Sequence, residues 1–350
     1  MVEAAGFEFA ETEKFLNAGE DIMGEFIWGR YDLLMLPPSF PYGGMENPNL
    51  TFITPTLLSG DRSLTNVVAH EIAHSWTGNS VSCKTWEHFW LNEGFTVFLE
   101  RKILGRLFGQ SMFEFQASQG SMGLKLAVDF FGAGHNFTRL VPDLSDGKDP
   151  DDAFSRIPYE KGFYFLAWLE KLVGGAETFE PFFAAFNMRH RRTAVESSDF
   201  RAAFEEAFPD KKVDWDAWFF EPGMPPEENT YDTSLGDKAY ALAKTWHFAD
   251  VMGIGVRGLP EGTSAGDLEE FNTQQVIAFL DKLGEWRCTK ALHESTCRLM
   301  SDTYGFDQSG NSEIQCAWLE LCVKAEDGTV LPACKRFLSR QGRMKYLRPI

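Results

Sequence analysis

The sequence contains no long run of apolar residues. Its longest apolar stretches are a few residues long, whereas crossing a bilayer takes about 20 consecutive apolar residues. The first residues, MVEAAGFEFAETEK, are acidic and have neither the cationic region nor the apolar region of a secretory signal. We therefore expect no membrane span and a cytoplasmic location.

Cysteine is scarce over most of the chain. Five of the six cysteines lie beyond residue 287, and no two are spaced as a Cys-x-x-Cys pair. A disulfide cluster stays open on the count alone, but reduced thiols are favoured because the sequence shows no secretory signal.

Positive charge is also in short supply. The chain has 33 lysines and arginines against 51 aspartates and glutamates, a formal net charge of −18. An acidic protein repels phosphate groups, so we expect no general binding to nucleic acid or anionic lipid. Apolar residues nevertheless make up 44% of the chain and aromatic residues 14%, which suffices for a sizeable core and excludes a disordered chain.

Local patterns change from strands to helices along the chain. Residues 31–36 and 50–54 are rich in β-forming residues and are predicted to be strands. Ser63 is the expected N-cap of a helix that runs through Trp76. A second helix is expected over residues 86–107.

The clearest boundary signal is the proline-rich stretch 221–228, which has no core-forming residues and should stay extended. Beyond it, apolar residues recur at helical spacing, for example over residues 314–322. We predict a mixed N-terminal unit, a linker and an all-helical unit, covering residues 1–222, 223–236 and 237–350.

The segment His70-Glu-Ile-Ala-His74 indicates a metal site. Residues four apart share one face of a helix, so His70 and His74 can hold one Zn²⁺ from the same side. Glu71 is then placed to take a proton from water on that metal. A catalytic zinc needs three protein ligands and one open position. Glu93, on the next predicted helix, is the natural third ligand.

These motifs resemble those of the M1 metallopeptidases, the zinc aminopeptidases of the gluzincin group. Residues 43–47, Gly-Gly-Met-Glu-Asn, match the exopeptidase motif of that family, and residues 158–162, Pro-Tyr-Glu-Lys-Gly, match the segment that holds its catalytic tyrosine. Residues 86–94 and 342–349 are similar to the branch that contains leukotriene A4 hydrolase and aminopeptidase B, and residues 77–79 and 84–86 resemble the former more than the latter.

The resemblance implies an α+β, thermolysin-like zincin catalytic domain followed by an all-α, armadillo/HEAT-like C-terminal domain, with one zinc ion as cofactor. The family normally has a large β-rich domain before the catalytic one, and this chain starts about where the catalytic domain would. We therefore expect that β domain to be absent and the helical C-terminal domain to be incomplete.

The resemblance also implies roles for single residues. Glu46 would hold the free α-amino group of a substrate, and Tyr159 would donate its phenol O–H to the developing oxyanion. Asp151 matches the residue that directs water to a distant carbon of a lipid epoxide. Arg343 and Lys345 would bind the carboxylate of the substrate. The other expected substrate-binding residues are Tyr42, Gly43, Gly44, Met45, Trp86, Phe89 and Met344.

Two residues depart from the family pattern near the expected lipid site. Phe154 stands where the vertebrate hydrolases have a tyrosine, and Glu87 replaces an aspartate. Both changes leave the zinc chemistry intact and bear on leukotriene specificity. A third acid, Glu100, lies seven residues after Glu93 and so on the same helical face. It would orient a metal ligand or be an ordinary surface acid, and both interpretations stay open.

We predict a zinc aminopeptidase that hydrolyses the N-terminal peptide bond of short peptides. Epoxide hydration of the leukotriene A4 type is a second activity expected in the same pocket, so the expected partners are short peptides and an epoxide fatty acid. Two alternatives stay open: an aminopeptidase B-like enzyme without lipid activity, and a non-catalytic zinc-binding scaffold. Intact Glu71 and Tyr159 argue against the scaffold, which needs neither.

Overall fold

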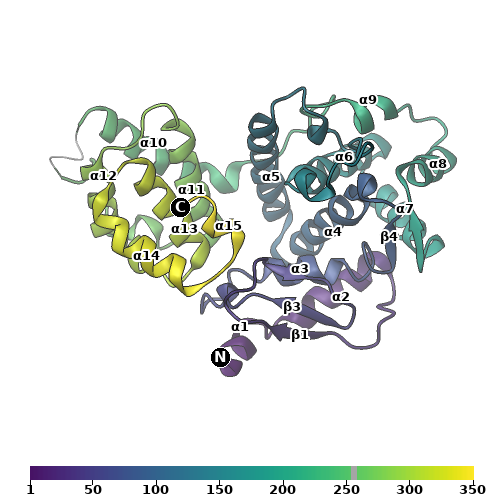
Figure 1. Cartoon of the computed structure of the whole chain (residues 1–350), viewed down its shortest axis with the longest axis horizontal. Helices are drawn as coiled ribbons and strands as arrows, with labels where there is room; N and C mark the ends of the chain where they lie inside the picture. The colour runs from purple at the N-terminus through teal and green to yellow at the C-terminus, as the bar shows by residue number, and fades with distance from the viewer. Residues whose placement is uncertain (254–257) are drawn as a thin grey trace.

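The computed structural model describes residues 1–253 and 258–350. Figure 1 shows two bodies side by side: the purple-to-teal first part of the chain, and the green-to-yellow helices that follow it. In the described ranges, no helix combines the length and the apolar character that crossing a membrane requires.

The first body contains nine helices and two small sheets among the described residues. Its helices are α1 (Val2–Glu8), α2 (Thr12–Met23), α3 (Asn66–Ala73), α4 (Trp90–Phe108), α5 (Gln110–Phe131), α6 (Ile157–Val173), α7 (Ala176–Arg189), α8 (Ser197–Ala207) and α9 (Trp215–Phe220). Its strands are β1 (Asp32–Met35), β2 (Gly44–Met45), β3 (Leu50–Ile53), β4 (Val81–Cys83) and β5 (Thr193–Val195).

The larger sheet has the order β1-β3-β2 and lies beside α3 (Figure 1). Strand β1 runs parallel to β3, with Leu33 opposite Thr51, and β2 runs antiparallel to β3, with Gly44 opposite Ile53. The two longer strands confirm the strands expected from the sequence. Strand β2 is an edge strand of this sheet and contacts α3.

Large aromatic side chains fill the core of the first body. Trp90, Phe95, Phe98 and Phe165 are fully or almost fully buried. The rings of Phe95 and Phe165 pack edge-on and tilted against Trp90, and the ring of Phe98 packs edge-on against Phe183. Helices α4 and α6 cross at the centre of this core.

The crossing of α4 and α6 depends on two glycines. A Cβ atom added to Gly162 would lie 2.7 Å from the Cα atom of Gly94, well inside van der Waals contact. Glycine at both positions therefore lets the two backbones approach closely. This contact places the start of α6 next to the start of α4.

The predicted helix boundaries were partly wrong. Helix α3 begins at Asn66 with Thr65 as its N-cap, and it ends at Ala73. Ser63 does not cap it: its hydroxyl donates to Ser59 and accepts from the side chain of Asn311 in the second body. The second predicted helix is divided, because a 3₁₀ turn, η2 (Trp86–His88), precedes α4.

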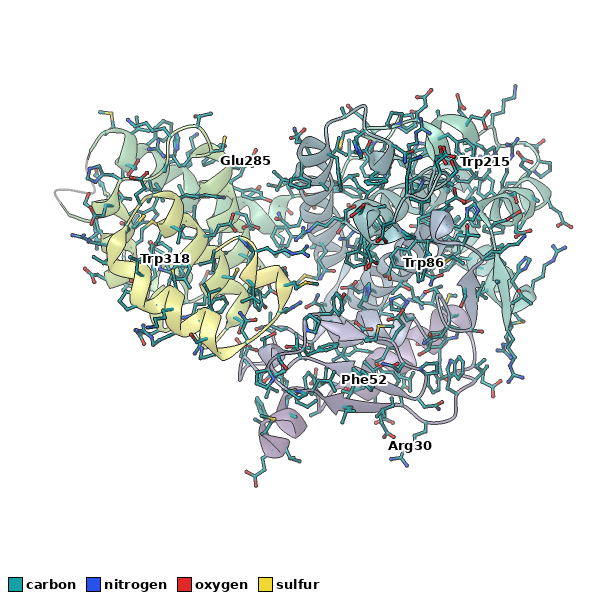
Figure 2. All side chains as sticks on the ribbon, in the orientation of Figure 1. Arg30, Phe52, Trp86, Trp215, Glu285 and Trp318 are labelled. Carbon is teal, nitrogen blue, oxygen red and sulfur yellow. The ribbon has the colours of Figure 1, made fainter. Side chains whose placement is uncertain are left out.

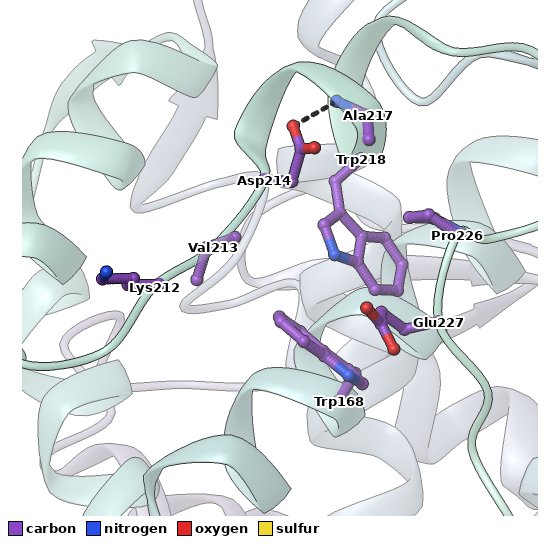
Figure 3. A pocket seen from close by; sticks show the side chains of 8 residues that line it. All are labelled: Trp168, Lys212, Val213, Asp214, Ala217, Trp218, Pro226 and Glu227. Atoms are coloured by element: carbon purple, nitrogen blue, oxygen red, sulfur yellow. Dashed lines mark hydrogen bonds between the residues drawn. The ribbon is translucent and has the colours of Figure 1, made fainter.

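The proline-rich stretch is packed against the first body. Figure 3 shows Pro226 and Glu227 beside the rings of Trp168 and Trp218, which lie 5.1 Å apart. These residues line a surface hollow of about 440 Å³ that contains none of the predicted site residues. The hollow therefore lies where the proline-rich stretch meets the first body.

The second body is all-helical in its described residues. It contains α10 (Asp237–Val251), α11 (Thr273–Trp286), α12 (Glu294–Tyr304), α13 (Ser312–Lys324), α14 (Leu331–Arg340) and α15 (Met344–Leu347). Trp246, Phe279 and Trp318 are buried in its own core, whereas Trp215 belongs to the core of the first body (Figure 2). We retain the predicted domain boundary at 223–236 as a proposal.

The C-terminal segment crosses back to the first body. The backbone N–H of Gly342 donates to the carbonyl of Pro38 at 2.7 Å, and that of Met344 donates to the carbonyl of Pro41 at 2.9 Å. Residues 341–346 therefore lie against the loop that leads into β2.

Candidate metal centre and substrate site

Three predicted metal ligands converge between α3 and α4. The Nε2 atoms of His70 and His74 lie 3.2 Å apart. The Oε2 atom of Glu93, in the first turn of α4, lies 3.5 Å from Nε2 of His70 and 3.3 Å from Nε2 of His74. One nitrogen from each ring and one carboxylate oxygen thus face a common point.

Hydrogen bonds at the other ring nitrogens set the orientation of both histidines. Nδ1 of His70 lies 2.9 Å from the Glu100 carboxylate, and Nδ1 of His74 lies 2.8 Å from the carbonyl of Thr77. Each Nδ1–H donates to its oxygen, so each Nε2 lone pair is free to bind a metal. Of the two interpretations of Glu100, the structure favours the one in which it orients a ligand.

The donor set fits a zinc ion. Two histidines and one glutamate are a known ligand set of catalytic zinc, which leaves a fourth position open. The Oε2 atoms of Glu93 and Glu71 are buried and, within the described part of the chain, have no hydrogen-bond partner. Buried carboxylate oxygens without partners are costly, and a cation at this point would satisfy them.

The electrostatics of the centre follow from burial and close opposite charges. Burial opposes ionisation of Glu93, but the neighbouring histidines outweigh it and lower the pKa of Glu93 to about 2. Burial also opposes protonation of His74, yet the acidic groups beside it raise its pKa to about 9. For Glu71 burial dominates and raises the pKa to about 7. Glu93 and His74 therefore favour each other's charged form, whereas burial makes Glu71 a weaker acid than a free glutamate.

Two glutamates lie beside the metal ligands. Oxygen atoms of Glu46 and Glu71 lie within 4.8 Å of each other and of a nitrogen of His74. Glu71 packs against the bare Cα of Gly44, where a Cβ would come within 2.2 Å of Oε1 of Glu71. The edge strand β2 thus carries Glu46 close to the base and the metal ligands.

Tyr159 lies at the start of α6 and stacks on a metal ligand. Its ring centroid is 6.2 Å from that of His70, with an angle of 22° between the rings. Burial raises the pKa of the phenol well above its usual value, and the acids Glu93 and Glu46 raise it further. The phenol therefore keeps its proton and remains a hydrogen-bond donor.

Aromatic rings continue from Tyr159 to the surface. The ring centroid of Phe154 lies 6.2 Å from that of Tyr159, 6.3 Å from that of Phe89 and 6.5 Å from that of Tyr42. Trp86 extends the row at 5.4 Å from Phe89. Tyr42, Phe154 and Trp86 are all exposed. We call these five residues the aromatic wall.

Asp151 lies on the short 3₁₀ turn η4 (Pro150–Ala153), and its side chain is exposed. Its backbone N–H donates to Asp149, so the turn is held by its own acids. The side chain of Glu87 accepts a hydrogen bond from the backbone of Leu144 and ties down the segment that leads into this turn.

Arg343 reaches the first body from the C-terminal segment. One of its guanidinium nitrogens would lie 2.7 Å from a Cβ atom on Gly43, so the guanidinium rests on the glycine pair of the exopeptidase motif. The guanidinium is buried and pairs with Glu313 at 3.2 Å, and Lys345 pairs with the other oxygen of Glu313 at 2.7 Å. Burial opposes ionisation of Glu313, but these two cations outweigh it and lower its pKa to about 2.

The sequence did not single out every residue of the site. Thr96 lies on α4 three residues after Glu93, and its hydroxyl lies 3.1 Å from Nδ1 of His74 and donates to the carbonyl of Thr77. Helical spacing from Glu93 is a signal that points to Thr96. Glu313 lacks any such signal, because nothing near it in the sequence marks it as the partner of Arg343.

Comparisons with known proteins agree with this site. Residues 7–218 match the peptidase family M1 domain, and residues 271–350 match the C-terminal domain of leukotriene A4 hydrolase. Leukotriene A-4 hydrolase of Xenopus laevis is 44% identical over 355 residues, which cover 100% of this chain and 57% of that protein. Leucine aminopeptidase 2 of Ajellomyces capsulatus is 43% identical over 349 residues, which cover 97% of this chain and 54% of that protein.

A solved structure also matches the whole fold. Yeast LTA4 hydrolase in complex with bestatin has a TM-score of 0.92 and 36% identity, covering 99% of this chain and 58% of that one. This confirms the predicted zincin catalytic fold and the helical C-terminal fold. The chain spans a little over half the length of these relatives. Because the M1 model covers more than half of the chain and its motif residues meet at one centre, the chain belongs to peptidase family M1.

Proposed function

We propose that this protein is a zinc aminopeptidase that removes the first residue of short peptides. The observation that carries the proposal is the position of Glu46, whose carboxylate lies within 4.8 Å of Glu71 and His74. A carboxylate at that distance pairs with the ammonium of a chain that ends there. Only the first peptide bond of such a chain reaches the metal centre.

His70, His74 and Glu93 would hold one zinc ion, which when bound supplies a Lewis acid that polarises the carbonyl of the scissile bond. Glu71 accepts a proton from the attacking water, and the proton then passes to the leaving amine. Tyr159 donates its phenol O–H to the oxyanion.

The remaining residues position the substrate. The aromatic wall offers apolar surface to side chains. Arg343 and Lys345 are the candidates for binding the carboxylate of a short peptide. The relatives support the proposal, since one is named leucine aminopeptidase and another leukotriene A-4 hydrolase. A cytoplasmic location fits the six cysteines, all of which are free thiols in the structure.

The test is metal analysis and an aminopeptidase assay on the purified chain, with Glu71→Gln as the central variant. Glutamine keeps the shape of Glu71 but cannot accept a proton, so the variant should retain zinc and lose about 10³-fold in kcat. Activity within tenfold of the parent would mean that another base is used. Near-absent activity in the parent, with zinc bound, would favour the scaffold alternative.

A second assay tests the exopeptidase assignment. The parent should cleave peptides with a free amine and leave N-acetylated ones intact, and Glu46→Ala should weaken the first reaction. A charge-assisted hydrogen bond contributes about 1.5–3 kcal/mol, which corresponds to about a 10- to 150-fold effect. Equal cleavage of both peptides by the parent would contradict the proposal.

A second activity, hydration of an epoxide fatty acid of the leukotriene A4 type, is favoured by the aromatic wall and by Asp151. The turn that carries Asp151 precedes Tyr159 by a few residues, and its side chain is exposed. An acid there would direct water to a remote carbon of a conjugated chain while the epoxide C–O bond opens.

Asp151→Asn should abolish the lipid diol and spare much of the peptidase rate, whereas Tyr159→Phe should mainly damage peptide cleavage. The products are separated by chirality after incubation with leukotriene A4. Absence of a diol from the parent would leave an aminopeptidase B-like enzyme. Equal loss of both activities in Asp151→Asn would show that Asp151 has only a structural role.

A further inference from the structure

We propose that Asn79 is a positioning residue that fixes Glu46 at a set distance from the metal ligand His74. The inference deepens the proposed aminopeptidase function and rests on it. It assigns a role to the segment Thr77-Gly-Asn79, which the roles of the metal ligands and the base leave unexplained.

The segment 77–79 forms a turn that wraps around His74. The carbonyl of Thr77 accepts the Nδ1–H of His74 at 2.8 Å, and the backbone N–H of Asn79 donates to the carbonyl of His74 at 3.1 Å. Gly78 has φ +114°, and a Cβ there would lie 2.7 Å from Nδ1 of His74. The turn is therefore in direct contact with the ligand.

The side chain of Asn79 extends from this turn to the exopeptidase motif. Its Nδ2 donates to the backbone carbonyl of Glu46 at 2.6 Å. Glu46 is the first residue beyond β2, whose residue Met45 pairs with Phe52 of β3. Strand β3 therefore holds the chain up to Met45, and Asn79 holds the next residue from the side of the metal centre.

The side chain of Asn79 thus links the metal position to the position of the substrate ammonium. The metal position depends on His74, and the ammonium position depends on Glu46. If Asn79 loses its amide, the orientation of His74 survives, because the backbone of Thr77 sets it. The Glu46 carboxylate loses its fixed distance to the metal centre. Binding of the substrate amine should then weaken while metal binding stays the same.

The experiment compares the parent with Asn79→Ala and with Asn79→Asp. Aspartate has the shape of asparagine but offers no N–H when ionised, so it should behave like alanine or worse. Each variant should raise KM about five- to tenfold for a free-amine peptide, the effect of one neutral hydrogen bond. Zinc content and kcat should stay close to those of the parent.

Asn136→Ala is the matched control. Its Nδ2 also donates to a backbone carbonyl, that of Asp143, at 2.8 Å, but on the loop that follows α5. This variant loses the same kind of bond, together with the bond that its Oδ1 accepts from the backbone N–H of Asp143, and should keep the parent KM.

A double-mutant cycle separates positioning from general damage. If Asn79 acts through Glu46, then Asn79→Ala should add nothing to KM in a Glu46→Ala background. Additive effects would overturn the proposal, and so would loss of zinc or of the folded state in both Asn79 variants. A parent that cleaves acetylated and free peptides equally would instead refute the exopeptidase assignment of Glu46 itself.

Discussion

The metal end of the site is its set of candidate ligands, His70, His74 and Glu93. Its carboxylate end is Arg343, which we propose binds the carboxylate of the substrate, and the two ends are built in different ways. His70, His74 and Glu93 come from two successive helices of one body, within 24 residues of sequence. Arg343 comes from the far end of the chain and reaches the same loop region through the docked segment 341–346. The first arrangement depends on local helix geometry, and the second depends on how two bodies pack.

The difference also appears in the supporting contacts. Each imidazole is oriented by a neighbour on α4 or in the turn after α3, so the metal end supports itself. Arg343 is held by Glu313 of α13, and a glycine in the other body leaves room for its guanidinium. Substitutions near α3 and α4 should therefore disturb the metal ligands, whereas substitutions in either body should disturb the position of Arg343.

The largest effect should follow from removing a metal ligand. His74→Ala leaves two protein ligands and an unpaired Glu93, so zinc should no longer co-purify and activity should fall to background. Zinc content is measured by elemental analysis, with Arg343→Ala as the control that should retain one ion. Near-stoichiometric zinc in His74→Ala would refute the ligand assignment.

A smaller effect should follow from removing the partner of a ligand. Glu100→Ala leaves Nδ1 of His70 without its acceptor, and zinc affinity should fall about 10- to 100-fold. Competition with a chelator measures the affinity. Glu100→Gln is the control, because its amide oxygen still accepts the hydrogen bond and should preserve most of the affinity. Unchanged affinity in Glu100→Ala would mean that the contact is incidental.

Removing Arg343 should change which substrates bind well. Arg343→Ala should raise KM about 10- to 100-fold for a tripeptide with a free C-terminal carboxylate, and leave KM for the C-terminal amide nearly unchanged. Arg340→Ala is the control, because Arg340 is an exposed arginine of the same region that bonds Gln315. Equal changes for both tripeptides would show that Arg343 acts on the docking of the two bodies.

The smallest effect concerns the helix crossing that joins Tyr159 to the metal helix. In Gly162→Ala the new methyl group would meet Gly94 at 2.7 Å, so α6 must shift, at a cost of about 1–3 kcal/mol in the free energy of unfolding. Denaturant unfolding measures this, and kcat should fall with zinc retained. Gly6→Ala, in the open space around α1, should instead be neutral or slightly stabilising. A parent-like stability for Gly162→Ala would contradict the tight crossing.

Sequence patterns predicted elements whose signals are local. The strands at 31–36 and 50–54 and the helical C-terminal part were confirmed because β-forming residues and helical spacing act over a few residues. The cap at Ser63 was wrong, since its hydroxyl bonds Asn311, a residue almost 250 positions away in the other body. The capping propensity of serine is a local property and does not predict a hydrogen-bond partner so far away in the sequence.

In the candidate site, too, sequence patterns indicated residues at helical spacing but not their tertiary partners. The role of Glu100 could be narrowed only to two options, because helical spacing places it on the face of Glu93 but does not show what lies opposite. The contact with His70 decided between them. The residue Glu313 was missed, since its importance comes only from the position of Arg343.

The sequence by itself determined the candidate metal centre: the spacing of His70 and His74 on one helical turn, Glu71 between them and Glu93 in the first turn of the next α-helix. These follow from helix geometry, which acts over a few residues. Only the tertiary structure decided where Tyr159 and Arg343 lie, because residues so far apart meet through the packing of α4 on α6 and of one body on the other. That packing depends on many side chains together, and no short segment encodes it.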